Sequence, residues 1–297
     1  LFGLPVGSDI SAGATSIVME IRLPRILAAV AVGAALATSG AAFQSLLRNP
    51  LADPYVLGTS SGAALGAAIA FLVPITGIAW ELGGVQLAAF IGALASVALV
   101  WRIAGIGSGE ERIASVLLVG YAVASLLAAA LSLVMLASGA NLRAIFGFLL
   151  GGLDGVTWPR LAAAAVPIAL ATLLLARRGR ALAAFLLGDE GATHLGIDVR
   201  RERRIAVALA TLATASAVAL AGLVGFVGLV VPHLARLAVG SDPRAVLPLS
   251  AIGGALLLLL ADTVARTIGV PVGVITALIG APFLLWLLHR ARAGYAL

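Results

Sequence analysis

Arginine supplies all of the fixed positive charge in this 297-residue chain. The nineteen basic residues are all arginines, against thirteen acidic residues and three histidines, so the formal net charge is +6. A phosphate-binding loop of the Walker type needs a lysine that reaches the β- and γ-phosphates. Because the sequence has no lysine, this chain cannot form such a loop, and any ATP that drives it must bind to a partner subunit.

Side chains suited to nucleophilic or metal chemistry are few and scattered. Ser60 or Ser61, together with His233, could imitate an intramembrane serine protease, but no third residue marks either serine as activated. His194, His233 and His289 fall in separate segments without metal-ligand spacing, and cysteine is absent. We therefore expect no catalytic residue, no bound metal and no cofactor in this chain.

The elements that must position the polar residues are membrane helices. Hydrophobic residues make up 62% of the chain and charged residues 11%, and the mean hydropathy is +1.14. A helix needs roughly 20 apolar residues to cross a bilayer core of about 30 Å, and these long runs lack the alternation of barrel strands. We predict an all-α, polytopic membrane protein with a single transmembrane domain over residues 1–297. About nine spans are expected, at 24–47, 55–73, 82–101, 113–137, 158–176, 205–221, 226–239, 245–265 and 270–289.

Arginines are distributed unevenly between alternate connections of these spans. Thirteen fall on one side, and the other side has five, which are Arg22, Arg25, Arg143, Arg160 and Arg266. The positive-inside rule makes the richer side cytoplasmic, so the chain begins outside, ends inside and has an odd number of spans. Residues 6–20 are expected to form a polar, non-spanning lead-in. We expect an upstream tenth helix before it, with a cleaved signal sequence as the alternative.

A polar break separates two long runs without charged residues, 26–47 and 55–80. It reads Arg48-Asn49-Pro50-Leu51-Ala52-Asp53-Pro54, and its two prolines stop the first helix from continuing. By the arginine distribution, this break is a cytoplasmic turn.

Motifs along nearly the whole chain occur in an order and spacing that resemble those of a known protein family. They are Arg22 to Arg25, Gly33 to Gly40 with Gln44, Arg48 to Pro54, Leu57 to Ala63, Gly225 to His233 with Arg236, Ala261-Asp262 with Ala265-Arg266, and Pro271 to Phe283 with Trp286. Together they resemble the permease family of type II ABC importers for iron-siderophores, haem and vitamin B12. One departure is the short connection between Arg266 and Pro271, which lacks the longer loop usual in that family.

The resemblance implies partners and a location. Such permeases have ten helices and work in the bacterial cytoplasmic (inner) membrane as homodimers, with two ATPase subunits and an extracytoplasmic substrate-binding protein. The expected cargo is a metal chelate, with haem or a ferric siderophore first and cobalamin next. Besides these proteins we expect only membrane lipid as a partner, and no nucleic acid, because the arginines form no basic face with interleaved aromatic residues.

The resemblance also implies roles at both ends of the molecule. Arg22, Arg25 and Arg266 match positions that receive glutamates of the binding protein, and arginine–carboxylate pairs suit oriented, reversible docking. Interfacial anchoring or contact with a lipid phosphate is the alternative. Asn49 and Leu51 match part of a cytoplasmic gate, to which 105–113 would contribute, although they could also form an ordinary turn between helices.

A short amphipathic helix is expected near 188–197, within the long arginine-rich connection. It resembles the element that couples such permeases to their ATPases, and the alternative is a solvated basic loop. Gly188 and Gly196 permit tight turns at its ends, and acidic residues at its start suit the helix dipole. The expected coupling residues are Gly188, Asp189, Glu190, Ala192, Leu195 and Gly196.

An ion-coupled secondary transporter is the main rival function, because many spans and broken helices also fit that class. Such a transporter needs intramembrane carboxylates for ion coupling, and this chain has almost none. Asp262 is the carboxylate within a late apolar run, and we expect it to pair with Arg266 one helical turn away.

Overall fold

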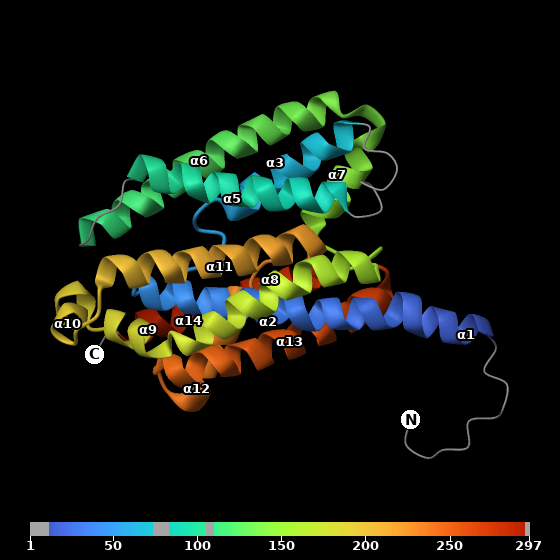
Figure 1. The fold of residues 1–297 in the computed structure, drawn as a ribbon. Helices are drawn as coiled ribbons and strands as arrows, with labels where there is room; N and C mark the ends of the chain where they lie inside the picture. The colour runs from blue at the N-terminus through green and yellow to red at the C-terminus, as the bar shows by residue number, and fades with distance from the viewer. Residues whose placement is uncertain (1–11, 74–82, 105–109, 295–297) are drawn as a thin grey trace, which may run out of the picture.

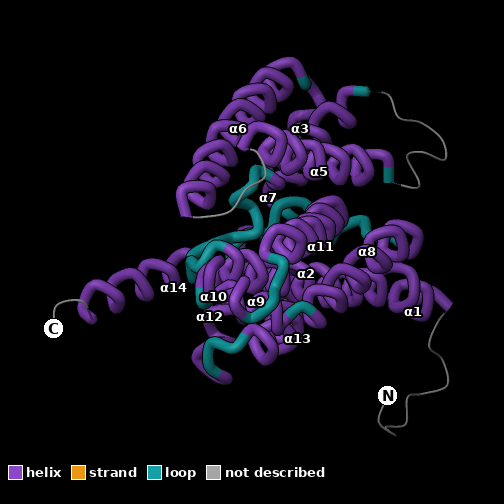
Figure 2. The backbone as a smooth tube through the Cα atoms, turned by 60° about the vertical axis from the view of Figure 1, so that its left-hand side comes forward, coloured by secondary structure: helices purple, strands orange, loops and turns teal. Residues whose placement is uncertain are grey.

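Helices form the fold throughout the residues that the computed structural model describes, which are 12–73, 83–104 and 110–294. The all-α prediction is confirmed. Figure 1 shows two groups of helices, with α3, α5 and α6 in one layer and α2, α8, α11, α12 and α13 in the other, and Figure 2 shows the same division. The elements are α1 (Ala12–Ser16), η1 (Ile17–Arg22), α2 (Leu23–Leu46), α3 (Thr59–Leu72), α5 (Gly84–Ala104), α6 (Glu110–Ala137), η2 (Gly139–Asn141), α7 (Leu142–Leu150), α8 (Trp158–Arg177), α9 (Gly179–Phe185), α10 (Gly188–His194), α11 (Val199–Ala221), α12 (Val227–Val239), α13 (Pro243–Ile268) and α14 (Val272–Gly294).

Each of the nine predicted spans contains a helix. Seven helical stretches of the described chain are long and apolar enough to cross a bilayer, and they make this a multi-pass membrane protein. The other two, α3 and α12, have 14 and 13 residues. At 1.5 Å per residue they reach only about 20 Å, so the non-helical segments before them must complete the passage.

The N-terminal lead-in differs from its prediction. Residues 12–22 are helical, and they continue into α2 as one 34-residue helix, Gly13–Leu46. A π-helical stretch, η1, lies within it and carries Arg22 in its last turn. The indole N–H of Trp158, at the start of α8, donates to the carbonyl of Met19 at 3.0 Å. Residues 6–11 of the predicted lead-in lie outside the described chain.

Helix α2 lies at the centre of its layer, and small residues let its neighbours approach closely. A Cβ added at Gly33 would lie 2.1 Å from the carbonyl oxygen of Gly254 on α13, and one added at Gly40 would lie 1.9 Å from that of Gly228 on α12. Helices in lipid associate through such small-residue contacts, because apolar burial alone gives little preference for protein over lipid. The glycine motifs are therefore packing surfaces of α2.

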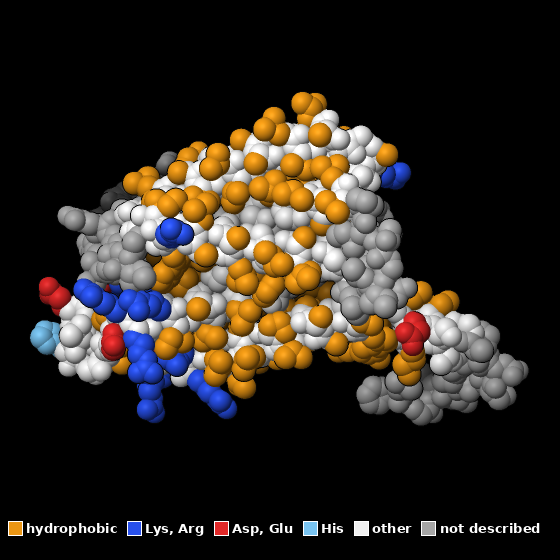
Figure 3. All heavy atoms as spheres, turned by 45° about the horizontal axis from the view of Figure 1, so that its top comes forward, with side chains coloured by type: hydrophobic (Ala, Val, Ile, Leu, Met, Phe, Trp, Pro, Cys, Tyr) orange, Lys and Arg blue, Asp and Glu red, His pale blue; other side chains and the backbone are white. Residues whose placement is uncertain are grey.

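Charge marks the two ends of the molecule. Figure 3 shows basic side chains gathered at the end that carries α9 and α10. Two helices begin at this end with aspartate caps, since Asp198 accepts from the Arg201 N–H and Asp242 from the Arg244 N–H. Below, this is called the α10 end, and the opposite end, where α2 begins, is called the α2 end.

Candidate functional site

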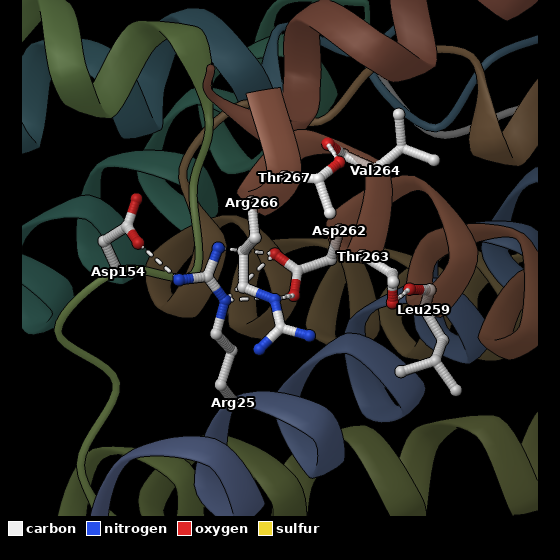
Figure 4. A network of polar contacts seen from close by, with 8 residues as sticks. All are labelled: Arg25, Asp154, Leu259, Asp262, Thr263, Val264, Arg266 and Thr267. Carbon is white, nitrogen blue, oxygen red and sulfur yellow. Dashed lines mark hydrogen bonds and ion pairs between the residues drawn. The ribbon is translucent and has the colours of Figure 1, made fainter. Parts of the chain in front are cut away.

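The α2 end holds a cluster of ion pairs around a buried carboxylate. Arg25 donates through Nε and Nη2 to Asp262, at 3.0 and 2.8 Å, and Asp262 is almost fully buried on α13. Arg266 lies one turn further along α13, with its Nε 3.6 Å from the same carboxylate. The predicted pairing of Asp262 with Arg266 is confirmed, but the stronger pair joins α2 to α13. Figure 4 shows both guanidinium groups converging on Asp262.

The third member of this cluster comes from a different part of the chain. Asp154, in the connection between α7 and α8, accepts from Nη1 of Arg25. Its side chain is 78% exposed, whereas that of Arg25 is 15% exposed. Arg25 is thus enclosed between one buried and one exposed carboxylate, and its guanidinium faces inward.

The other two arginines expected to dock a partner are accessible. Arg22 and Arg266 are both exposed, and they line a hollow of about 390 Å³ together with Ile26, Thr263 and Thr267. The two threonine hydroxyls donate to carbonyls of their own helix, at 2.8 and 2.7 Å. The cations of this hollow, rather than its hydroxyls, are therefore the groups that can meet an anion from outside.

A second polar junction lies at the broken helices. Gln44, buried on α2, donates from Nε2 to the carbonyls of Ala52 and Gly228, at 3.1 and 3.2 Å. Its Oε1 accepts from Nη2 of Arg236 on α12 at 2.6 Å. One amide thus satisfies two carbonyls of irregular backbone and orients an arginine, as membrane burial requires of polar groups.

Further side chains satisfy the same backbone. The Tyr55 hydroxyl donates to the Val224 carbonyl at 3.0 Å, and Thr59 donates to the Pro54 carbonyl at 3.0 Å. Pro54 also packs directly on the Cα face of Gly228, where an added Cβ would lie 2.6 Å from its ring. The segments that precede α3 and α12 therefore contact each other through a hydrogen bond and close packing. The polar break is part of the packed interior.

The predicted gate residues lie in the turn that starts this break. The side-chain oxygen of Asn49 accepts from the Leu51 N–H at 2.9 Å, and the Asn49 N–H donates to the Gln44 carbonyl at 3.1 Å. Arg48 adopts a positive φ of 49°, which few non-glycine residues do. Asn49 is exposed and shapes the turn, and Leu51 is half-buried. The contribution expected from 105–113 lies largely outside the described residues.

Burial changes the acidity of Asp53, which lies in the connection before α3. Its carboxylate accepts one hydrogen bond, from the Tyr55 N–H at 2.8 Å. Burial outweighs this bond and raises the pKa of Asp53 to about 6.

The coupling segment predicted near 188–197 contains α10. Gly188 and Gly196 flank it with φ of 85° and 77°, so the expected tight turns are present. Ala192 is fully buried, and Asp189 pairs with Arg203 of α11 at 2.6 Å. The Arg203 guanidinium also lies 5.4 Å from the Phe185 ring centroid. These contacts fix α10 against α9 and α11.

The outer surface of α10 is exposed and carries both apolar and polar side chains. Leu187 and Leu195, at its two ends, are 67% and 62% exposed, and Glu190 is also exposed. Exposed leucines beside a buried alanine give the helix one face toward the protein and one toward solvent. Such a face suits a protein partner at the α10 end.

The serines and the histidine weighed for protease chemistry lie on different helices, α3 and α12. Ser60 and Ser61 lie in the first turn of α3. The imidazole of His233 packs edge-on against Phe283 of α14, with ring centroids 5.8 Å apart. Figure 2 shows α14 extending away from the other helices toward the C-terminus.

Two functional contacts were missed from the sequence. No feature of the sequence indicated a role for Asp154, because a lone aspartate in a connection between spans is ordinary. For Gln44 the sequence did contain such a feature, since a polar residue in a charge-free apolar run must find hydrogen-bond partners within the protein. Its two acceptors and its donor lie up to 192 residues away, so their identity required the structure.

Comparisons with known proteins agree along the whole chain. Residues 5–290 match the family described as the FecCD transport family. The cobalamin import system permease protein BtuC of Halobacterium salinarum is 45% identical over 97% of this chain and 76% of its own length. The hemin transport system permease protein HmuU of Yersinia pestis is 42% identical over 92% of this chain and 83% of its own length.

A solved structure has the same arrangement of helices. It is described as an inward-facing conformation of an ABC transporter of the metal-chelate type, and it superposes with a TM-score of 0.86 at 31% identity. The alignment covers 97% of this chain and 91% of the other. A second structure, PsaBC from Streptococcus pneumoniae in complex with Fab, superposes with a TM-score of 0.63 at 17% identity, which concerns the fold alone.

Proposed function

Because this chain belongs to the FecCD transport family, a family of ABC importer permeases, we propose that it imports a metal chelate across the cytoplasmic (inner) membrane. The observation that carries this proposal is the match over residues 5–290, joined to relatives named for cobalamin and hemin transport. Those names favour a metal–tetrapyrrole cargo, haem or cobalamin. A ferric siderophore, which the sequence resemblance ranked beside haem, becomes the third choice.

The chain acts as the membrane-spanning subunit and takes its energy from partners. With no lysine it cannot form a Walker loop, so two ATPase subunits bind and hydrolyse the ATP. A second copy of this chain completes the pathway for the cargo, and an extracytoplasmic binding protein delivers it. The α2 end then faces outward and the arginine-rich α10 end faces the cytoplasm, in accord with the positive-inside rule.

Roles for the polar sites follow from their exposure. Arg22 and Arg266 receive carboxylates of the binding protein in their shared hollow, and Arg25, paired with Asp262 beside them, is the third docking arginine. At the other end, α10 couples to the ATPase through its exposed leucines, while Ala192 and Asp189 hold it to the permease. Asn49 and Leu51 contribute to the cytoplasmic gate by fixing the turn between α2 and α3.

An ion-coupled secondary transporter is the less favoured function. Asp262 is the one acidic side chain that is fully buried within the described residues. It is paired with two guanidinium groups, so it already belongs to a structural ion-pair cluster.

Transport in proteoliposomes tests the proposed function. The permease is reconstituted with its ATPase and binding protein, and uptake of haem, cobalamin and a ferric siderophore is compared. We expect uptake of a tetrapyrrole that requires both ATP and the binding protein. Uptake of none of the three would contradict the cargo class, and uptake driven by a proton gradient without ATPase would favour the secondary transporter.

A further inference from the structure

Asp154 occupies the one side of Arg25 that faces away from the protein interior. The Nε and Nη2 groups of Arg25 are directed to Asp262, which is 2% exposed, and Nη1 is directed to Asp154, which is 78% exposed. With a side chain only 15% exposed, Arg25 has little room for a further acceptor. A carboxylate arriving from outside can therefore reach Arg25 only by replacing Asp154.

The surroundings favour such an incoming carboxylate. Arg22 and Arg266 are exposed cations at the same end, and Arg266 shares Asp262 with Arg25. The ion-pair cluster holds Arg25 and Arg266 against Asp154 and Asp262, and Arg22 adds an exposed cation beside it in the shared hollow. A partner with more than one carboxylate can form ion pairs with the exposed Arg22 and Arg266 and also with Nη1 of Arg25.

The segment that carries Asp154 is joined by backbone contacts to two other elements. The Gly152 N–H donates to the Ala221 carbonyl at 2.8 Å, and the Gly273 N–H donates to the Gly151 carbonyl at 3.4 Å. Gly151, with φ of 67°, leaves no room for a side chain, because a Cβ would lie 2.3 Å from the Leu223 oxygen. Gly151 and Gly152 thus contact the end of α11, the turn after it and the start of α14.

We propose that Asp154 is an internal substitute for a carboxylate of the binding protein. Docking exchanges the two carboxylates on Nη1 of Arg25, and the exchange frees the Asp154 side chain next to Gly151 and Gly152, which contact the turn between α11 and α12. This inference rests on the proposed function, because it needs a docking protein at the α2 end. Asp262 acts as a positioning residue that keeps Arg25 and Arg266 aimed at the exchange site.

Binding of the purified, cargo-free binding protein to the permease in nanodiscs tests the exchange. Asp154→Asn keeps the shape of the side chain but removes the competing charge, and Asp154→Glu retains the charge. Exposed ion pairs are weak, so we expect Asp154→Asn to tighten binding by about two- to fivefold and Asp154→Glu to leave it near that of the wild type. Glu20→Gln is the matched control, since it removes an exposed carboxylate on η1 at the same end that lies outside the ion pairs described around Arg25.

Hydrogen exchange at Gly152, whose N–H donates to the Ala221 carbonyl, provides the second measurement. In the wild type, amide protection there should fall when the binding protein is added, and in Asp154→Asn it should be low without it. Equal binding by Asp154→Asn and the wild type, equal tightening by Glu20→Gln, or unchanged protection on docking would each overturn the inference. A wild-type permease that binds no binding protein, while Arg22→Glu behaves identically, would instead overturn the proposed docking function itself.

Discussion

Arg25 of α2 and Asp262 of α13 form a polar link between two helices of the same layer, with Nη2 2.8 Å from the carboxylate. Removing one partner of a buried pair leaves an uncompensated charge, which costs about 3–5 kcal/mol. Asp262→Asn should therefore lower the free energy of unfolding by about 3 kcal/mol, measured by thermal unfolding in detergent. The double variant Arg25→Met, Asp262→Leu should recover most of that loss, and Asp154→Asn should cost under about 1 kcal/mol. A single variant as stable as the wild type would contradict this role.

Gln44 should contribute more to the stability of the fold than is usual for a neutral side chain. In Gln44→Leu, two carbonyls and the Arg236 guanidinium lose the amide that satisfies them, and buried groups without partners cost about 1–3 kcal/mol each. We expect a loss of about 2–4 kcal/mol in thermal unfolding. Ser45→Ala is the neighbouring control and should cost under about 1 kcal/mol, because Ser45 donates only to its own helix, at Ala41. Equal losses in both variants would show that Gln44 is no special junction.

Gly33 tests the close packing of α2 on α13. Its added Cβ would lie 2.1 Å from the Gly254 oxygen, which is backbone and cannot rotate away. Gly33→Ala should cost about 3 kcal/mol, at the upper end for overpacking. In Gly147→Ala nothing lies within 4 Å of the new methyl group, and α7 should gain up to about 1 kcal/mol. Thermal unfolding of the two variants in the same detergent distinguishes these opposite signs.

Apolar length was enough to predict where the spans lie, because each run without charges can bury its backbone only as helix. It was not enough to predict that α3 and α12 are short, since Tyr55–Gly58 and Gly222–Phe226 are apolar too. Their irregular backbone depends on partners such as Gln44 and Tyr55, which reach across 184 and 169 residues. Pairing between Asp262 and Arg266 was predictable from helical spacing, whereas the Arg25 pair spans 237 residues and was not.

Asp53 should make stability depend on pH. Its pKa rises from 3.8 to about 6 on folding, so the folded state binds the proton more tightly than the unfolded state. Stability should therefore fall as the pH rises from about 4 to about 6. Asp53→Asn, which keeps an oxygen for the Tyr55 N–H, should remove this dependence and stabilise the protein at pH 8 by up to about 3 kcal/mol. Unfolding temperatures of both proteins at pH 4 and pH 8 provide the measurement, and a parallel pH dependence in the variant would contradict the assignment.

A substitution at Leu195 should weaken binding of the ATPase at the α10 end without disturbing the fold. Its side chain is 62% exposed beside the buried Ala192, so Leu195→Asp should change unfolding by only about 0.5 kcal/mol. A carboxylate in the centre of an apolar contact is costly to desolvate, and we expect at least a tenfold loss of ATPase retained on purification. Thr193→Ala is the control on the same helix, because its hydroxyl donates to the Asp189 carbonyl and not to a partner. If the ATPase still copurifies fully with Leu195→Asp, then the exposed face of α10 is not the coupling surface, and partner binding must be sought elsewhere at the arginine-rich end.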